Sequence, residues 1–160
     1  MLRTPWWKGT RGEWYVVGQI ALMVLVFLGP QTWSGLPGWT FYPQLCSIIG
    51  SVLLVVGGIL LFAGIFKLGA NLTAMPYPKE QGTLIETGPY QCVRHPMYGG
   101  ILIPFGWALW VQGWLTLAYA IILLIFFDIK SRREERWLKE KFSGYVAYQK
   151  RVRKLIPFVY

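Results

Sequence analysis

Two long blocks of the chain, residues 14–66 and 95–127, contain no Asp, Glu, Lys or Arg. Apolar runs inside these blocks predict four membrane-crossing helices, near residues 14–29, 45–66, 98–111 and 114–127. A helix needs about 20 residues to cross a bilayer, and the run "LCSIIGSVLLVVGGILLFAGIF" reaches that length on its own. The last two runs are short and are joined by Gln112 and Gly113, as in a tight helical hairpin. The pattern predicts an all-α integral membrane protein with about four transmembrane helices, forming one domain over residues 1–160.

The placement of charge predicts the orientation of these helices. The formal net charge is +9, and four crossings put all sixteen Lys and Arg residues on one side of the membrane. That side holds the N-terminus, the 67–97 loop and the 128–160 tail, whereas segments 31–44 and 112–113 on the other side carry no charge. The positive-inside rule makes the charged side cytoplasmic. We therefore expect a multi-pass protein with both termini in the cytoplasm, of the kind found in a prokaryotic cytoplasmic membrane.

The end of the tail is basic and amphipathic. Tyr145, Tyr148, Val152 and Leu155 recur at helical spacing. Basic residues fill the positions between them: Lys150, Arg151, Arg153 and Lys154. This pattern favours a helix bound to anionic membrane lipids over a nucleic-acid-binding segment. A metal site is not expected either, because one histidine and two separated cysteines do not form a ligand set.

A carboxylate stripe is predicted just beyond the fourth apolar run. The segment "FFDIKSRREERWLKEKF" continues that run without Gly or Pro. One helix through it would align Lys130, Glu134, Leu138 and Phe142 at steps of four residues, with Glu135 beside them. Two interpretations remain open here. Lys130 and Glu134 form a solvated surface pair, or the helix presents its carboxylate to a functional site.

The 67–97 loop contains the densest polar cluster of the chain, "GPYQCVRHPMYGG", with the single histidine. Pro96 is a natural first residue of a helix, which places His95 at its cap. A helix N-terminus favours an anionic group, and Arg94 and His95 add donors for a carboxylate. A positive-inside arginine followed by a capping histidine explains the same residues, and the residues alone favour neither interpretation.

Taken together, "GTLIETGPYQCVRHPMYGG", a hydrophobic hairpin and "EERWLKEKFSGYVAYQKRVRKLIPF" resemble the isoprenylcysteine carboxyl methyltransferase family over roughly residues 66–158. The phospholipid N-methyltransferases are more distant kin. The resemblance implies an integral membrane enzyme that uses S-adenosyl-L-methionine and releases S-adenosyl-L-homocysteine. It places the cofactor in a cytoplasmic loop against the helical extension. The cofactor-binding residues that it implies are Leu84, Ile85, Tyr90, His95, Pro96, Met97, Tyr98 and Glu134, with Glu135 as a neighbouring alternative.

Roles follow from the resemblance and from the chemistry of methyl transfer. Arg94 is expected to join His95 at the polar end of the cofactor, and Glu134 to meet its hydroxyls or ammonium. The family's substrate-side basic residue, an arginine in the isoprenylcysteine enzymes, corresponds here to Lys130, with Arg133 nearby. Lysine keeps the charge without the bidentate fork. Lys130, Arg133 and Glu134 are therefore the expected catalytic set.

The expected acceptor of the methyl group is a lipophilic small molecule or a lipidated molecule. Prenylated thiols, lipid amines and small hydrophobic acids all remain possible acceptors. Two other classes of protein stay open. Membrane sterol reductases, which use NADPH, resemble the C-terminal half, with an Arg-His-Pro-Asn-Tyr motif where this chain has Met97 before Tyr98. A non-catalytic membrane protein that keeps the fold is the third class.

Overall fold

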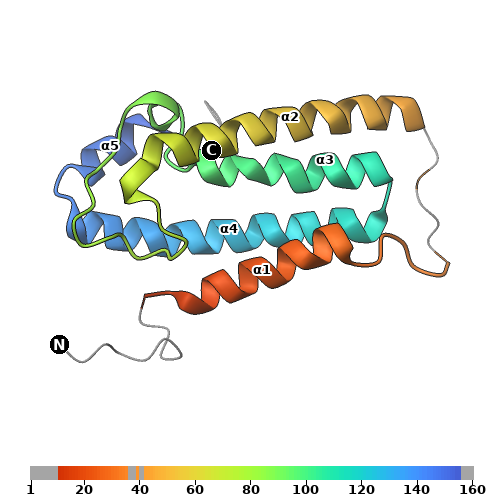
Figure 1. Cartoon of the computed structure of the whole chain (residues 1–160), viewed down its shortest axis with the longest axis horizontal. Coiled ribbons are helices and arrows are strands. Elements are labelled where there is room, and N and C mark those ends of the chain that lie inside the picture. Colours follow the sequence, from red (N-terminus) through yellow and green to blue (C-terminus); the bar gives the residue numbers. More distant parts are fainter. Residues whose placement is uncertain (1–10, 36–38, 40–41, 156–160) are drawn as a thin grey trace.

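The computed structural model describes residues 11–35, 39 and 42–155. Four helices lie side by side along the long axis of the molecule (Figure 1). They are α1 (Glu13–Leu28), α2 (Pro43–Leu68), α3 (Leu102–Val111) and α4 (Trp114–Lys141). The shorter elements are η2 (Gly69–Asn71), η3 (Gly88–Gln91), η4 (Pro96–Ile101) and α5 (Tyr145–Arg151). No β-sheet occurs in these described ranges, and the all-α prediction is confirmed at this level.

The helices differ in whether they are long enough to cross a bilayer. The helical runs Pro43–Asn71 and Trp114–Lys141 are 29 and 28 residues long and strongly apolar, with mean hydropathies of 2.7 and 1.7 over their best windows. The helical runs Glu13–Leu28 and Pro96–Val111 are apolar but shorter. The described chain therefore contains two helices that are long and apolar enough to span a membrane, and the crossing of the membrane by four helices stays a prediction.

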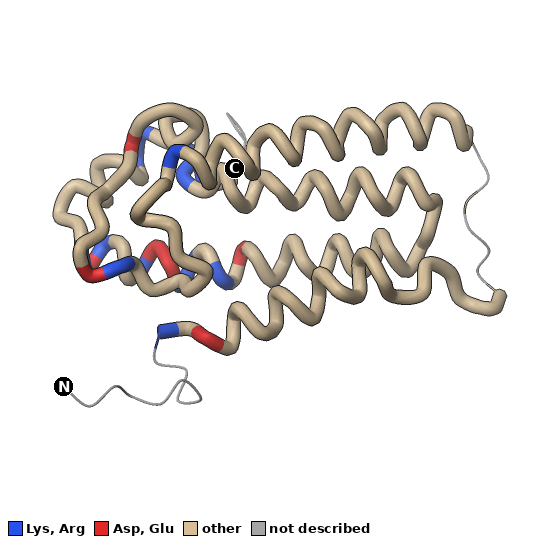
Figure 2. Tube along the Cα trace, in the orientation of Figure 1, with Lys and Arg blue, Asp and Glu red and all other residues tan. Residues whose placement is uncertain are grey.

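The described charges gather at one end of the bundle (Figure 2). That end holds the loop after α2, the second half of α4 and α5. The opposite end holds the uncharged turn from α3 to α4, where the Leu115 amide donates to the Gln31 carbonyl. The helices thus keep the polar loop and the polar half of α4 together, which is the arrangement that a site shared between them requires.

Small residues on α2 allow a close approach to α3 and η4. Gly50, Gly57 and Gly64 recur every two turns and form the buried face of α2. A Cβ added at Gly57 would lie 2.9 Å from the backbone nitrogen of Ile103. Such small-residue seams let helix backbones pack closely in membranes, where the hydrophobic effect does not drive helices together.

We expect Gly57→Ala to lower the stability of the folded protein by about 1–3 kcal/mol, because backbone as well as side chains must shift to admit the methyl group. Gly58→Ala is the matched control, because its Cβ would have no neighbour within 4 Å and alanine favours a helix. Thermal unfolding in detergent measures both variants. Equal melting temperatures would contradict the proposed α2–α3 seam.

The end of the chain differs from the predicted lipid-bound helix. Helix α5 ends at Arg151, and Tyr145 and Tyr148 are buried in the protein. The Tyr148 hydroxyl donates to the Tyr90 carbonyl at 2.6 Å. Beyond the helix, the backbone amides of Arg94 and His95 donate to the carbonyls of Arg153 and Lys154. The surface-anchoring prediction is therefore wrong for these tyrosines, because the 67–97 loop covers the face that lipid was expected to cover.

Candidate functional site

A cavity of about 220 Å³ lies at the charged end, between α1, α2, α4 and the loop that follows α2. A single buried water needs only ~10–15 Å³, so the cavity is large enough for more than ordered water. The whole predicted stripe of α4 lines this cavity: Lys130, Glu134, Leu138 and Phe142. The stripe therefore faces inward, toward the loop, rather than outward to solvent.

Lys130 is held inside the protein by neutral groups. The residue is 3% exposed, and its Nζ donates to Gln19 Oε1 at 2.5 Å and to the Ala74 carbonyl at 3.4 Å. The ammonium also lies 5.6 Å from the centre of the Tyr98 ring. No ion pair of Lys130 occurs within the described ranges. The interpretation of Lys130 and Glu134 as a solvated surface pair is therefore wrong.

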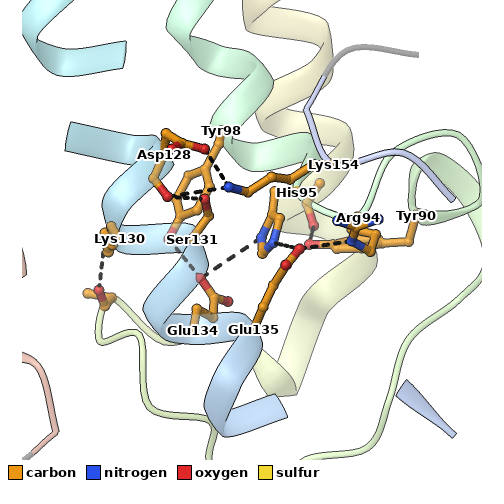
Figure 3. Close-up of polar contacts among 12 residues, drawn as sticks. Tyr90, Arg94, His95, Tyr98, Asp128, Lys130, Ser131, Glu134, Glu135 and Lys154 are labelled. Atoms are coloured by element: carbon orange, nitrogen blue, oxygen red, sulfur yellow. Dashed lines mark hydrogen bonds and ion pairs between the residues drawn. The ribbon is translucent and has the colours of Figure 1, made fainter. Parts of the chain in front are cut away.

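Glu134 is fixed by the residues of the "RHPMY" segment. The Tyr98 hydroxyl donates to Glu134 Oε2 at 2.8 Å, and His95 Nδ1 lies 3.9 Å from the same oxygen. The His95 ring stacks on Tyr98 at 5.2 Å, and Tyr98 stacks on Phe127 at 5.0 Å. Figure 3 shows His95 joined by dashed lines to both glutamates. The Glu134 side chain remains 27% exposed, so a ligand in the cavity can reach its carboxylate.

The Glu135 carboxylate is bound by other side chains of the protein. Arg94 Nε lies 2.8 Å from Glu135 Oε1, and His95 Nε2 lies 3.1 Å from the same atom. Gln149 Nε2 donates to Glu135 Oε2 at 2.9 Å, and Arg94 Nη1 also donates to the carbonyls of Gln149 and Val152. Both side chains of the Arg94–Glu135 pair are 9% exposed. This pair joins α4, the 67–97 loop and the C-terminal segment.

The backbone before η4 explains how one short segment serves both glutamates. His95 precedes the helical run at the predicted position, with Pro96 as its first residue. Proline fits there because the first N–H of a helix has no partner within the helix. The adjacent side chains Arg94 and His95 both meet α4, and Tyr98 follows in the first turn of η4.

Most residues that the sequence predicted for the site line the cavity: Leu84, Ile85, Tyr90, Arg94, His95, Met97, Tyr98, Lys130 and Glu134. Three others lie outside its walls. Pro96 packs near Gly64 of α2, Glu135 faces Arg94, and the Arg133 guanidinium lies 4.6 Å from the ring centre of Trp137. Of the two basic residues predicted for the substrate side, Lys130 therefore lines the cavity and Arg133 does not.

The residues that line the cavity without having been assigned to it by the sequence pattern include Gln19 of α1 and Tyr145 of α5. Tyr145 is 1% exposed, and its hydroxyl has no hydrogen-bond partner in the described part of the chain. Burial, followed by the charge of Glu135, raises the pKa of Tyr145, so the hydroxyl stays protonated. The sequence could have indicated the position of Gln19, because an amide within an apolar helix usually faces the protein interior.

Comparison with known proteins assigns the chain to a family. The family model described as phospholipid methyltransferase matches residues 45–144, more than half of the chain. The chain belongs to the phospholipid methyltransferase family. The matched region contains α2, η4, α3 and α4, and with them His95, Tyr98, Lys130 and both glutamates.

Curated relatives narrow the resemblance within the family. Protein-S-isoprenylcysteine O-methyltransferase B of Arabidopsis thaliana is 33% identical over 132 residues, covering 74% of this chain and 66% of the relative. The Saccharomyces cerevisiae enzyme is 30% identical over 124 residues, covering 72% and 51%, and the human enzyme is 30% identical over 132 residues, covering 74% and 45%. The predicted resemblance to the isoprenylcysteine methyltransferases is confirmed. This family member spans about half to two thirds of the length of these relatives.

Proposed function

We propose that this protein transfers a methyl group from S-adenosyl-L-methionine to a hydrophobic, membrane-resident acceptor at the cytoplasmic edge of the bilayer. One observation carries the proposal. A single cavity is lined by His95 and Glu134 at the charged end and by Leu123 and Phe127 from the apolar half of α4. A water-soluble cofactor and an oily acceptor can therefore meet within it. The relatives' names support methyl transfer over the NADPH-dependent alternative.

The polar residues of the cavity suit such a cofactor. S-adenosyl-L-methionine presents an ammonium, a carboxylate and ribose hydroxyls, which need both acceptors and donors. The Glu134 carboxylate can accept from an ammonium or a hydroxyl, and the buried Tyr145 hydroxyl has no hydrogen-bond partner among the described residues. Leu84, Ile85 and Met97 supply apolar wall. Arg94 contributes by holding Glu135 and the C-terminal segment in place.

Methyl transfer from a sulfonium needs little acid–base help from the protein. When bound, the cofactor supplies an electrophilic methyl group and leaves as a neutral thioether. The protein must hold the acceptor in line with that methyl group and exclude water. Phe127 and Tyr98, stacked beside Glu134, close the apolar side of the site. Lys130 then orients an acceptor that carries an anionic group, and a carboxylate acceptor reacts without deprotonation.

Calorimetry on the detergent-purified protein tests the cofactor, with S-adenosyl-L-homocysteine and NADPH as competing ligands. We expect S-adenosyl-L-homocysteine to bind with one site per chain and NADPH not to bind. Incubation with labelled S-adenosyl-L-methionine and a total lipid extract, followed by mass analysis, then identifies the methylated compound. Binding of NADPH without S-adenosyl-L-homocysteine would reject the proposal in favour of a reductase.

A further inference from the structure

Helix α1 contributes to the cavity although it lies outside the region that defines the family. The family model begins at residue 45, whereas Gln19 and Met23 of α1 line the cavity. Gln19 makes the shortest contact to the buried Lys130 ammonium, at 2.5 Å. Met23 is 36% exposed, so it belongs both to the cavity wall and to the outer apolar surface of the bundle. The wall formed by α1 thus reaches from Lys130 to the outer apolar surface of the bundle.

The hydrogen-bond partners of Lys130 are neutral groups. An ammonium removed from water is costly unless an opposite charge balances it. Lys130 donates to an amide oxygen and to a backbone carbonyl, whereas the Glu134 carboxylate accepts its hydrogen bond from Tyr98 and acts on the ammonium only through space. Lysine can only donate hydrogen bonds, so the Gln19 side chain must present its oxygen here. Gln19 therefore fixes the ammonium in place without cancelling its charge.

We propose that Gln19 is a positioning residue for the acceptor: it holds Lys130 between the polar and apolar parts of the cavity, so that Lys130 pairs with an acceptor's carboxylate while the acceptor's apolar chain lies along Met23. This rests on the proposed methyl transfer. Glutamate at position 19 would serve equally well as a structural partner of Lys130. A glutamate would, however, itself pair with the Lys130 ammonium, in place of the acceptor's carboxylate. The neutral amide of Gln19 leaves Lys130 able to form that ion pair with the acceptor.

The test compares Gln19→Glu with Gln91→Glu, which makes the same chemical change on an exposed residue of η3 outside the cavity. The probes are N-acetyl-S-farnesylcysteine, which joins a prenyl chain to one carboxylate, and its carboxamide. Wild type and Gln91→Glu should bind the carboxylate at least about tenfold more tightly than the carboxamide. Gln19→Glu should lose that preference while binding S-adenosyl-L-homocysteine as wild type does. In turnover of the carboxylate probe, KM should rise more than kcat falls.

Lys130→Met provides a second variant that does not depend on Gln19→Glu folding. It should also lose the preference for the carboxylate probe and keep cofactor binding. If wild type binds S-adenosyl-L-homocysteine but does not distinguish the two probes, the inference is overturned and the proposed cofactor stands. A Gln19→Glu variant that keeps the full preference overturns it as well. Failure of wild type to bind S-adenosyl-L-homocysteine counts against the methyl-transfer proposal itself.

Discussion

Replacing Glu135 by alanine is expected to destabilise the folded protein by about 3–5 kcal/mol, because it leaves the Arg94 guanidinium buried without its counter-ion. The same change removes the oxygens that bind His95 and Gln149. The 67–97 loop and the segment after α5 would both lose their attachment to α4. Unfolding in detergent, followed by circular dichroism against temperature or added denaturing detergent, measures the loss.

Glu140→Ala is the matched control, because Glu140 is an exposed residue of the same helix with no ion pair among the described residues. It should leave the unfolding transition within about 0.5 kcal/mol of wild type. Glu135→Gln separates charge from shape, since the amide keeps the volume but not the charge that pairs with Arg94. A Glu135→Ala variant as stable as Glu140→Ala would show that the Arg94–Glu135 pair does not hold the site together.

The sequence predicts the helices and the alignment of the α4 stripe, though not the direction in which the stripe faces, because both depend on local periodicity. The uninterrupted segment after Phe127 allows one continuous helix, and four-residue steps then place Lys130 and Glu134 on one face. The local pattern around His95 predicts only that a helix begins at Pro96, as it does. That this motif meets the α4 stripe is an expectation that comes from the family resemblance.

Other parts of the site depend on contacts between distant segments, and periodicity does not determine them. Tyr145 and Tyr148 have the spacing of a lipid-bound face, yet the loop that contains Tyr90 covers them. The sequence cannot distinguish these two apolar surroundings, because both satisfy the same pattern. Likewise, nothing local indicates that Arg94 pairs with Glu135 while His95 lies between the two glutamates. Which of the two adjacent carboxylates faces the cavity is determined only when α4 is packed against the loop.

Glu134→Gln is therefore expected to give the opposite result from Glu135→Ala. The Glu134 side chain is 27% exposed, and its hydrogen bond from the Tyr98 hydroxyl survives because the amide oxygen also accepts. Stability should change by less than about 1 kcal/mol. Binding of S-adenosyl-L-homocysteine should weaken by roughly 10–100-fold, because a charge-assisted hydrogen bond to the cofactor's ammonium or hydroxyls is lost.

Calorimetry and unfolding measured on the same preparations of Glu134→Gln and Glu135→Gln decide between the roles of the two glutamates. Glu134→Gln should unfold like wild type and bind the cofactor product weakly. Glu135→Gln should unfold more readily, because Arg94 and His95 are buried around that carboxylate. If Glu134→Gln binds S-adenosyl-L-homocysteine as tightly as wild type, Glu134 does not contact the cofactor. Lys130, four residues earlier on the same face, would then share the cavity with a carboxylate that serves Tyr98 and His95 alone.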